Sequence, residues 1–135
     1  MINYLQAAQS ELNNFNNFFS KKNHKEALAE LDLLTQKYPN DPNLFLFGGN
    51  CYVEMGHFNQ AILCYEEAIK LNPDLVDAHN NMGISLKEIG EIEKAVISFK
   101  KALKIKPDYA MVHNNLGICL YDLSQSKEAQ LCYIR

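Results

Sequence analysis

The sequence predicts an all-α fold: a right-handed α-α superhelix of about three and a half stacked helix-turn-helix repeats. Three sets of residues recur at one interval of 34: glycines, small alanines and helix-ending prolines. They are Gly49, Gly83 and Gly117; Ala27, Ala61, Ala95 and Ala129; and Pro39, Pro73 and Pro107. A fixed period between about 20 and 50 residues is typical of stacked-repeat proteins. We expect no β-strand.

The period divides the chain into units of one continuous domain, residues 1–135. The first, about 8–41, is a degenerate cap, because Phe15 stands at its glycine position while Ala27 and Pro39 keep the phase. Terminal repeats are often atypical because one side faces water. Complete units follow at 42–75 and 76–109. The unit at 110–135 is incomplete, and we expect either a fragment of a longer protein or a seam that pairs with another copy.

Local signals place two helices in each unit. Asp41 before Pro42 is typical of a helix start, and a proline cannot continue the preceding helix. Gly56 and Gly90 indicate the short turn between helices, and Ser124 stands at the third such turn. We therefore expect eight helices, near residues 3–20, 24–37, 42–55, 58–71, 76–89, 92–105, 110–123 and 126–135.

Small residues are expected where the paired helices cross. Each signature glycine on a first helix would meet the alanine of the second helix, with an aromatic residue filling the seam one turn later: Gly49, Ala61 and Tyr65; Gly83, Ala95 and Phe99; Gly117, Ala129 and Tyr133. Gly48 departs from the pattern, because a glycine inside a helix costs about 1 kcal/mol relative to alanine. His79 and His113 are expected to pack rather than to bind metal.

The residues that carry the period resemble the tetratricopeptide repeat. One copy reads Phe45-x2-Gly48-Gly49-x2-Tyr52 followed by Ala61-x3-Tyr65, and the next reads His79-x2-Met82-Gly83-x2-Leu86 followed by Ala95-x3-Phe99. A third begins at His113-x2-Leu116-Gly117-x2-Leu120 and continues to Ala129-x3-Tyr133. The resemblance covers nearly all 135 residues. It implies a solenoid that binds other proteins.

Composition disfavours several classes of protein. The net charge is −3, and the one cluster of lysines (Lys94, Lys100, Lys101, Lys104 and Lys106) is typical of a solvated helix face, so we expect no nucleic-acid partner. No apolar run approaches the length of a membrane span, and the N-terminus lacks the pattern of a secretory signal. We therefore expect no membrane partner and a cytoplasmic location.

No catalytic constellation emerges, so we expect a protein that is not an enzyme and has no cofactor, catalytic residue or metal site. The serines lie in no nucleophile motif, and the glycines do not form a phosphate loop. The four cysteines contain no C-x-x-C pair and obey the repeat, which favours buried free thiols at Cys51, Cys64, Cys119 and Cys132.

The remaining candidate site is the concave groove lined by the first helix of each unit. Positions three or four apart on these helices form one stripe, which is rich in asparagine and has an acidic rail at Glu54, Glu88 and Asp122. Asparagine offers both a donor and an acceptor to a peptide main chain, although these side chains could also merely solvate the face. The predicted groove residues are Asn43, Asn50, Glu54, Asp77, Asn80, Asn81, Lys87, Glu88, Asn114, Asn115, Tyr121 and Asp122.

The function expected is a non-catalytic scaffold that holds an extended peptide, with the acidic rail preferring basic side chains. The resemblance also implies a negative. Family members that hold the acidic C-termini of cytosolic heat-shock chaperones use cationic groove positions, which here are Leu46, Met111 and Asn115. Two alternatives stay open: the recognition or oligomerisation arm of a larger enzyme such as a transferase, and a homo-oligomeric module assembled through the uncapped last helix.

Overall fold

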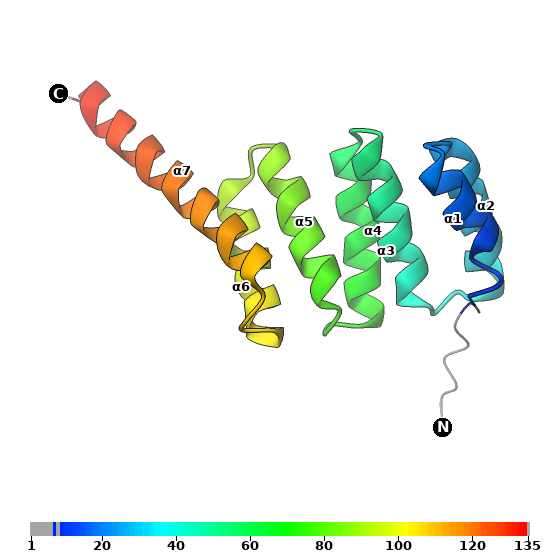
Figure 1. Ribbon diagram of the computed structural model, residues 1–135. Coiled ribbons are helices and arrows are strands. Elements are labelled where there is room, and N and C mark those ends of the chain that lie inside the picture. The colour runs from blue at the N-terminus through cyan, green and yellow to red at the C-terminus, as the bar shows by residue number, and fades with distance from the viewer. Residues whose placement is uncertain (1–6, 8, 135) are drawn as a thin grey trace.

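The computed structural model describes residue 7 and residues 9–134, of which the last three are described by their backbone alone. All regular structure in this part of the chain is helical, in the order α1 (Asn13–Ser20), α2 (His24–Lys37), α3 (Pro42–Glu54), α4 (Phe58–Leu71), α5 (Val76–Glu88), α6 (Ile92–Ile105) and α7 (Ala110–Ile134). Helical hairpins stand side by side in chain order (Figure 1). The predicted all-α solenoid is confirmed.

The hairpins are closed by turns in which one residue adopts a left-handed backbone. Gly56 and Gly90 have φ values of 76° and 85°, and Lys22 occupies the equivalent position of the first hairpin with φ 60°. Each turn carries the same pair of main-chain hydrogen bonds, as between the Gly56 amide and the Val53 carbonyl and between the His57 amide and the Tyr52 carbonyl. These bonds satisfy the last carbonyl groups of the helix and reverse the chain.

The start of α3 follows the capping signal expected from Asp41 and Pro42. The Asp41 side chain accepts a hydrogen bond from the Asn43 amide (3.0 Å) and Pro42 is the first residue of α3. The second carboxylate oxygen of Asp41 accepts a bond from the Ala7 amide at 3.0 Å. Asp41 is therefore buried with its acceptors used, and it ties the start of α3 to the N-terminal segment.

The core repeats with the sequence. Ala61, Tyr65, Ala95 and Phe99 are fully buried. The ring of Phe99 lies so close to Gly83 that a Cβ atom there would come within 2.6 Å of ring atom Cε1. The aromatic ring, rather than the alanine, is thus the nearest neighbour of the signature glycine. The ring occupies the space that the absent side chain leaves, while the expected meeting of the glycine with the alanine stays a prediction.

The N-terminal unit is shorter than its neighbours. Its first helix begins at Asn13 after a turn, whereas the sequence favoured a helix from residue 3; residues 3–6 and 8 lie outside the described part. Phe15 is buried and stacks on Phe47 of α3 at 5.5 Å between ring centroids. Lys37 and Tyr38 both bond to the carboxylate of Glu11. The ring contact joins the first hairpin to the second, and the Glu11 bonds join the N-terminal turn to the end of α2.

The last unit differs from the expectation, and the predicted turn at Ser124 is wrong. Helix α7 runs without a break from Ala110 to Ile134, so helices expected at 110–123 and 126–135 are one. Ser124 stands one full repeat after Gly90 but has no left-handed backbone. A serine resists that conformation more than glycine does. The C-terminal half of α7 consequently projects beyond α6 instead of folding back onto the first half (Figure 1).

A candidate groove on the inner face

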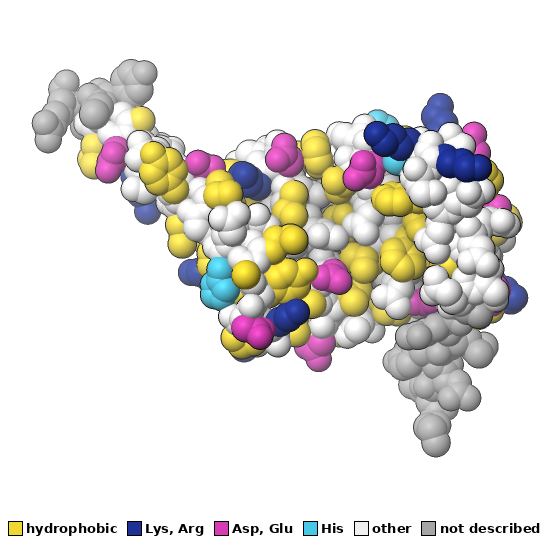
Figure 2. All heavy atoms as spheres, viewed as in Figure 1, with side chains coloured by type: hydrophobic (Ala, Val, Ile, Leu, Met, Phe, Trp, Pro, Cys, Tyr) yellow, Lys and Arg dark blue, Asp and Glu magenta, His cyan; other side chains and the backbone are white. Residues whose placement is uncertain are grey.

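The face formed by α3, α5 and the first half of α7, here called the inner face, contains a hollow of about 230 Å³. Its lining comes from four helices: Phe19 on α1, Asn50, Val53 and Glu54 on α3, Tyr65 on α4, and Asn81 and Ile84 on α5. Figure 2 shows mainly apolar and uncharged polar atoms across the middle of this view, with acidic side chains among them and, together with Lys or Arg side chains, along its upper margin. Three of the predicted groove residues therefore share one hollow.

Asn50 is the centre of a polar network in this hollow. Its carbonyl oxygen accepts hydrogen bonds from the Tyr65 hydroxyl (2.7 Å) and from the Asn81 side-chain amide (3.0 Å). Burial raises the pKa of Tyr65 well above its ordinary value, so this hydroxyl stays protonated and remains a donor. Two groups in the network have no hydrogen-bond partner among the described residues: the amide nitrogen of Asn50 and the carbonyl oxygen of Asn81. Together they offer one donor and one acceptor.

A second asparagine pair links α5 to α7. The Asn115 side-chain amide donates to the carbonyl oxygen of Asn80 at 3.2 Å. Asn80 is 2% exposed, so it is a buried link rather than an open contact point, in contrast to the expectation that it lines the groove. Asn115 is half-buried and keeps its own carbonyl oxygen available on the inner face. The asparagines therefore bridge neighbouring units as well as lining them.

The other predicted groove residues are spread along the inner face rather than gathered at the hollow. Asn43 and Lys87 are half-buried, while Asp77, Glu88, Asn114, Tyr121 and Asp122 are exposed, as Glu54 is beside the hollow. Asp77 accepts a bond from the Tyr109 hydroxyl at 3.4 Å, and its negative charge is the main cause of the raised pKa of Tyr109.

Sequence reasoning missed Phe19 and Tyr65 as groove residues. Phe19 stands one repeat before Val53, so extending the stripe into the degenerate first unit would have found it. Tyr65 was expected only in the core, and its ring is indeed fully buried. Its hydroxyl reaches the hollow because the ring passes over Gly49, a contact that only the packed hairpin shows.

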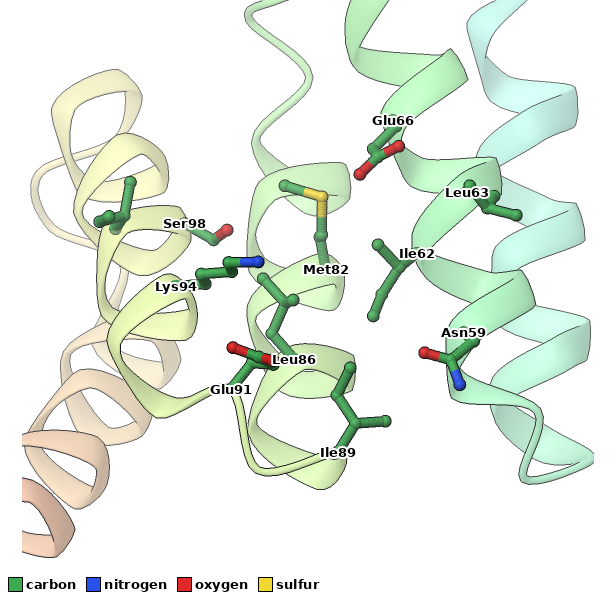
Figure 3. A pocket seen from close by; sticks show the side chains of 11 residues that line it. Asn59, Ile62, Leu63, Glu66, Met82, Leu86, Ile89, Glu91, Lys94 and Ser98 are labelled. Carbon is green, nitrogen blue, oxygen red and sulfur yellow. The ribbon is translucent and has the colours of Figure 1, made fainter.

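A larger hollow of about 470 Å³ lies on the other side, between α4 and α6, here called the outer face. Figure 3 shows Met82 and Leu86 of α5 at its floor, between Ile62 on α4 and Lys94 on α6. Its rim includes Leu63 and Ile97, which are exposed and occupy equivalent positions of neighbouring repeats on the two outer helices. This hollow is mainly apolar and lacks the convergent amide groups of the inner one.

The side chains considered for metal or redox chemistry have other surroundings. Nε2 of His79 lies 2.8 Å from the Pro73 carbonyl oxygen, and Nε2 of His113 lies 2.7 Å from that of Pro107, so each ring ties its helix to the preceding loop. No group of three potential metal ligands occurs among the described residues. Burial raises the pKa of the Cys51 and Cys64 thiols to about 11.

The prediction of buried free thiols is confirmed for two of the cysteines. Cys51 and Cys119 are buried free thiols and Cys64 is a half-buried one, while the side chain of Cys132 lies outside the described residues. The lysines at positions 94, 100, 101, 104 and 106 are exposed, as the sequence indicated. Within the described part of the chain, no helix is long and apolar enough to span a membrane.

Solved structures with the same fold include TPR domains with bound peptides. The first TPR of Spaghetti (RPAP3), bound to the HSP90 peptide SRMEEVD, superposes with a TM-score of 0.82 at 19% identity, over 85% of this chain and 91% of that one. The second TPR domain of human RPAP3, in complex with the HSP70 peptide SGPTIEEVD, gives 0.77 at 18%, over 82% and 92%. The Sgt2 TPR domain from Aspergillus fumigatus gives 0.82 at 13%, over 88% and 80%. These likenesses establish the fold.

Two sequence comparisons are more direct. Human protein O-mannosyl-transferase TMTC1 is 36% identical over 70 residues, which is 49% of this chain and 8% of that protein. The chain thus spans a small part of that relative's length. The family profile described as TPR repeat matches residues 49–90 and 85–124, which together cover more than half of the chain. With the sequence period and the hairpins that repeat it, this match shows that the chain belongs to the tetratricopeptide-repeat family.

Proposed function

We propose that the protein is a non-catalytic scaffold that binds an extended segment of another protein along its inner face. The observation that supports this most directly is the pair of amide groups at the hollow. The nitrogen of Asn50 and the carbonyl oxygen of Asn81 lie on side chains already held in place by their bond to each other. An extended peptide presents the complementary groups on its main chain, and fixed side chains lose little conformational entropy on binding.

Charge on the inner face favours a basic peptide. The peptides in the two RPAP3 structures contain the acidic sequence EEVD. In this chain the inner face carries the acidic rail of Glu54, Glu88 and Asp122, all of which are exposed. The positions at which the family resemblance implies cations for binders of acidic tails are Leu46, which is buried, Met111, and Asn115. Repulsion would oppose an acidic tail, whereas lysine or arginine side chains would complement the acidic rail.

Binding to two peptides of equal length and opposite net charge tests the proposal. We expect the protein to bind a peptide of the sequence SRMKKVK with higher affinity than SRMEEVD at low salt, as measured by fluorescence anisotropy. The difference in affinity should shrink as salt screens the acidic side chains of the inner face. Replacing Asn81 and Asn115 by alanine should weaken binding by at least ~1 kcal/mol, about fivefold in Kd. Asn59→Ala, an exposed asparagine on the outer face, is the matched control. Equal affinity in the groove and control variants would reject the asparagine contacts.

The partial match to the O-mannosyl-transferase favours a second candidate: a recognition or oligomerisation arm belonging to a larger enzyme. An antibody raised against the 135-residue chain would separate the two on an immunoblot of source cells. A band far above 15.4 kDa supports the arm, and a band at that mass rejects it. A cytoplasmic location remains part of the proposal, supported by free thiols at Cys51, Cys64 and Cys119, and cell fractionation with the same antibody tests it.

A further inference from the structure

Among the described residues, the fourth unit has the first helix of a hairpin but no second helix packed against it. In the three preceding units the chain reverses at Lys22, Gly56 and Gly90, all with left-handed backbones. At Ser124, the next position in this series, α7 continues instead. A helix rises about 1.5 Å per residue, so Ala129 lies about 18 Å along the axis from Gly117. The second half of α7 therefore cannot cover its own first half.

The uncovered surface is one that the other hairpins fill. A Cβ atom on Gly49 or Gly83 would meet an aromatic ring of the second helix, whereas one on Gly117 would meet nothing within 4 Å. Leu120 is 45% exposed, although Leu86, its equivalent one unit earlier, is 8% exposed and packed in the core. Gly117 and Leu120 together mark a surface on which a second helix could pack, here called the seat.

The segment that would fill this seat is exposed on the same helix. Ala61 and Ala95, on the second helices of their hairpins, are 0% exposed. Their equivalent Ala129 is exposed on the projecting half of α7. The aromatic residue of this series, Tyr133, follows Ala129 by four positions, as Tyr65 follows Ala61; its side chain lies outside the described residues. One chain thus carries both the seat and the helical segment that matches it. The straight course of α7 keeps the two apart.

We propose that two copies of the chain exchange the C-terminal halves of α7. The two helices would lie antiparallel, with Ala129 of each copy over Gly117 of the other, as Ala61 and Gly49 belong to one hairpin. The register of this pair is symmetric about residue 123, beside the missing turn, so both seats are filled by a single two-fold operation. Such exchange of an identical element closes a dimer through contacts that the fold already uses. A second copy fits better than an unrelated helix because its segment carries the alanine and aromatic residue at the spacing the seat requires.

This dimer goes beyond the proposed peptide binding and uses none of its amide groups. Asn50 and Asn81 lie outside the exchanged segment, at the hollow lined from α1 to α5. A failure of peptide binding would therefore leave the exchange untouched, and a monomeric chain would leave the groove in place.

Light scattering coupled to size exclusion tests the exchange on the full chain. We expect the wild-type protein to have twice the mass of 15.4 kDa, falling only on dilution. Gly117→Leu puts a side chain in the seat and should halve the mass. A Cβ atom at this position meets nothing within 4 Å in a single chain, so the side chain starts in open space. Unchanged circular dichroism would confirm that the variant folds. A wild-type mass of one chain, or a dimer that survives Gly117→Leu, overturns the proposal.

A second variant addresses the hinge. Ser124→Gly allows the left-handed backbone found at Gly56 and Gly90, so the second half of α7 can fold back onto its own Gly117. We expect this variant to be a monomer in which the second half of α7 covers the seat. Spin labels at Tyr121 and Lys127 on one chain should then report a shorter distance than their separation along a straight helix. A variant that keeps the straight-helix distance and the dimer mass would show that Ser124 is not the hinge.

Discussion

The aromatic ring of Tyr65 lies against the bare main chain of Gly49: a Cβ atom on that glycine would stand 2.7 Å from Cζ of the ring. The adjacent Gly48 is different, because its Cβ would only touch Cys64 and Leu31 at ordinary distances of 3.7 and 3.9 Å. We expect Gly49→Ala to lower the free energy of unfolding by about 1–3 kcal/mol through overpacking. Gly48→Ala should raise it by about 0.5–1 kcal/mol through helix propensity. Urea unfolding of the two neighbours measures both, and a gain at Gly49 would contradict the assigned contact.

Ala95→Leu tests the crossing point of the third hairpin. Ala95 is 0% exposed, so three more carbon atoms have no space and we expect a loss of about 1–3 kcal/mol in equilibrium unfolding. Lys94→Leu, an exposed neighbour on the same helix, should stay within about 0.5 kcal/mol of wild type. Equal stability of the two variants would mean that the helices cross elsewhere.

Tyr65→Phe isolates the hydroxyl that bonds to Asn50. The ring contact with Gly49 should survive, because Phe99 makes the same contact with Gly83 in the next hairpin. Loss of the 2.7 Å hydrogen bond should lower the free energy of unfolding by about 0.5–1.5 kcal/mol, as measured in urea. Tyr121→Phe removes an exposed hydroxyl and serves as the control, for which we expect no change.

Lys22→Gly should stabilise the first hairpin. Lys22 has φ 60°, a left-handed conformation that costs a residue with a side chain roughly 1–2 kcal/mol, and it is exposed. After subtracting the entropy that glycine loses on folding, we expect a gain of about 0.5–1 kcal/mol in thermal or chemical unfolding. Lys21→Gly, where φ is −87°, gives no such relief and should not stabilise. A loss at Lys22 would be the contrary outcome.

Alkaline pH should weaken the fold through the buried thiols. Burial raises the pKa of Cys51 and Cys64 from 9.0 to about 11, so the folded state holds these protons more tightly than the unfolded state. The resulting stability is complete below about pH 9 and is lost as the pH rises toward 11. Urea unfolding between pH 8 and 10 should show this decline, with a shallower slope in Cys51→Ala/Cys64→Ala. Identical slopes in the two proteins would place the titration elsewhere.

The sequence predicted which positions line the candidate groove, but not the hydrogen bonds that their side chains make. The stripe at Asn50, Glu54 and Asn81 followed from helical spacing and the repeat, and these residues do meet at the hollow. Which amide groups remain available did not follow, because that depends on bonds between units such as the one from Asn115 to the buried Asn80. Hydrogen bonds across a packed interface are fixed by helix separation and rotation, which a residue count does not contain.

By itself, the sequence determined the period, the all-α class, the turn glycines and the buried alanines of the complete repeats, because these depend on local backbone preference and side-chain size that recur from repeat to repeat. Only the tertiary structure decided the fate of the last unit. Ser124 is compatible with either a turn or a helix, and the choice depends on whether packing on Gly117 offsets the cost of a left-handed serine. Among the described residues α7 runs straight, and nothing packs on Gly117.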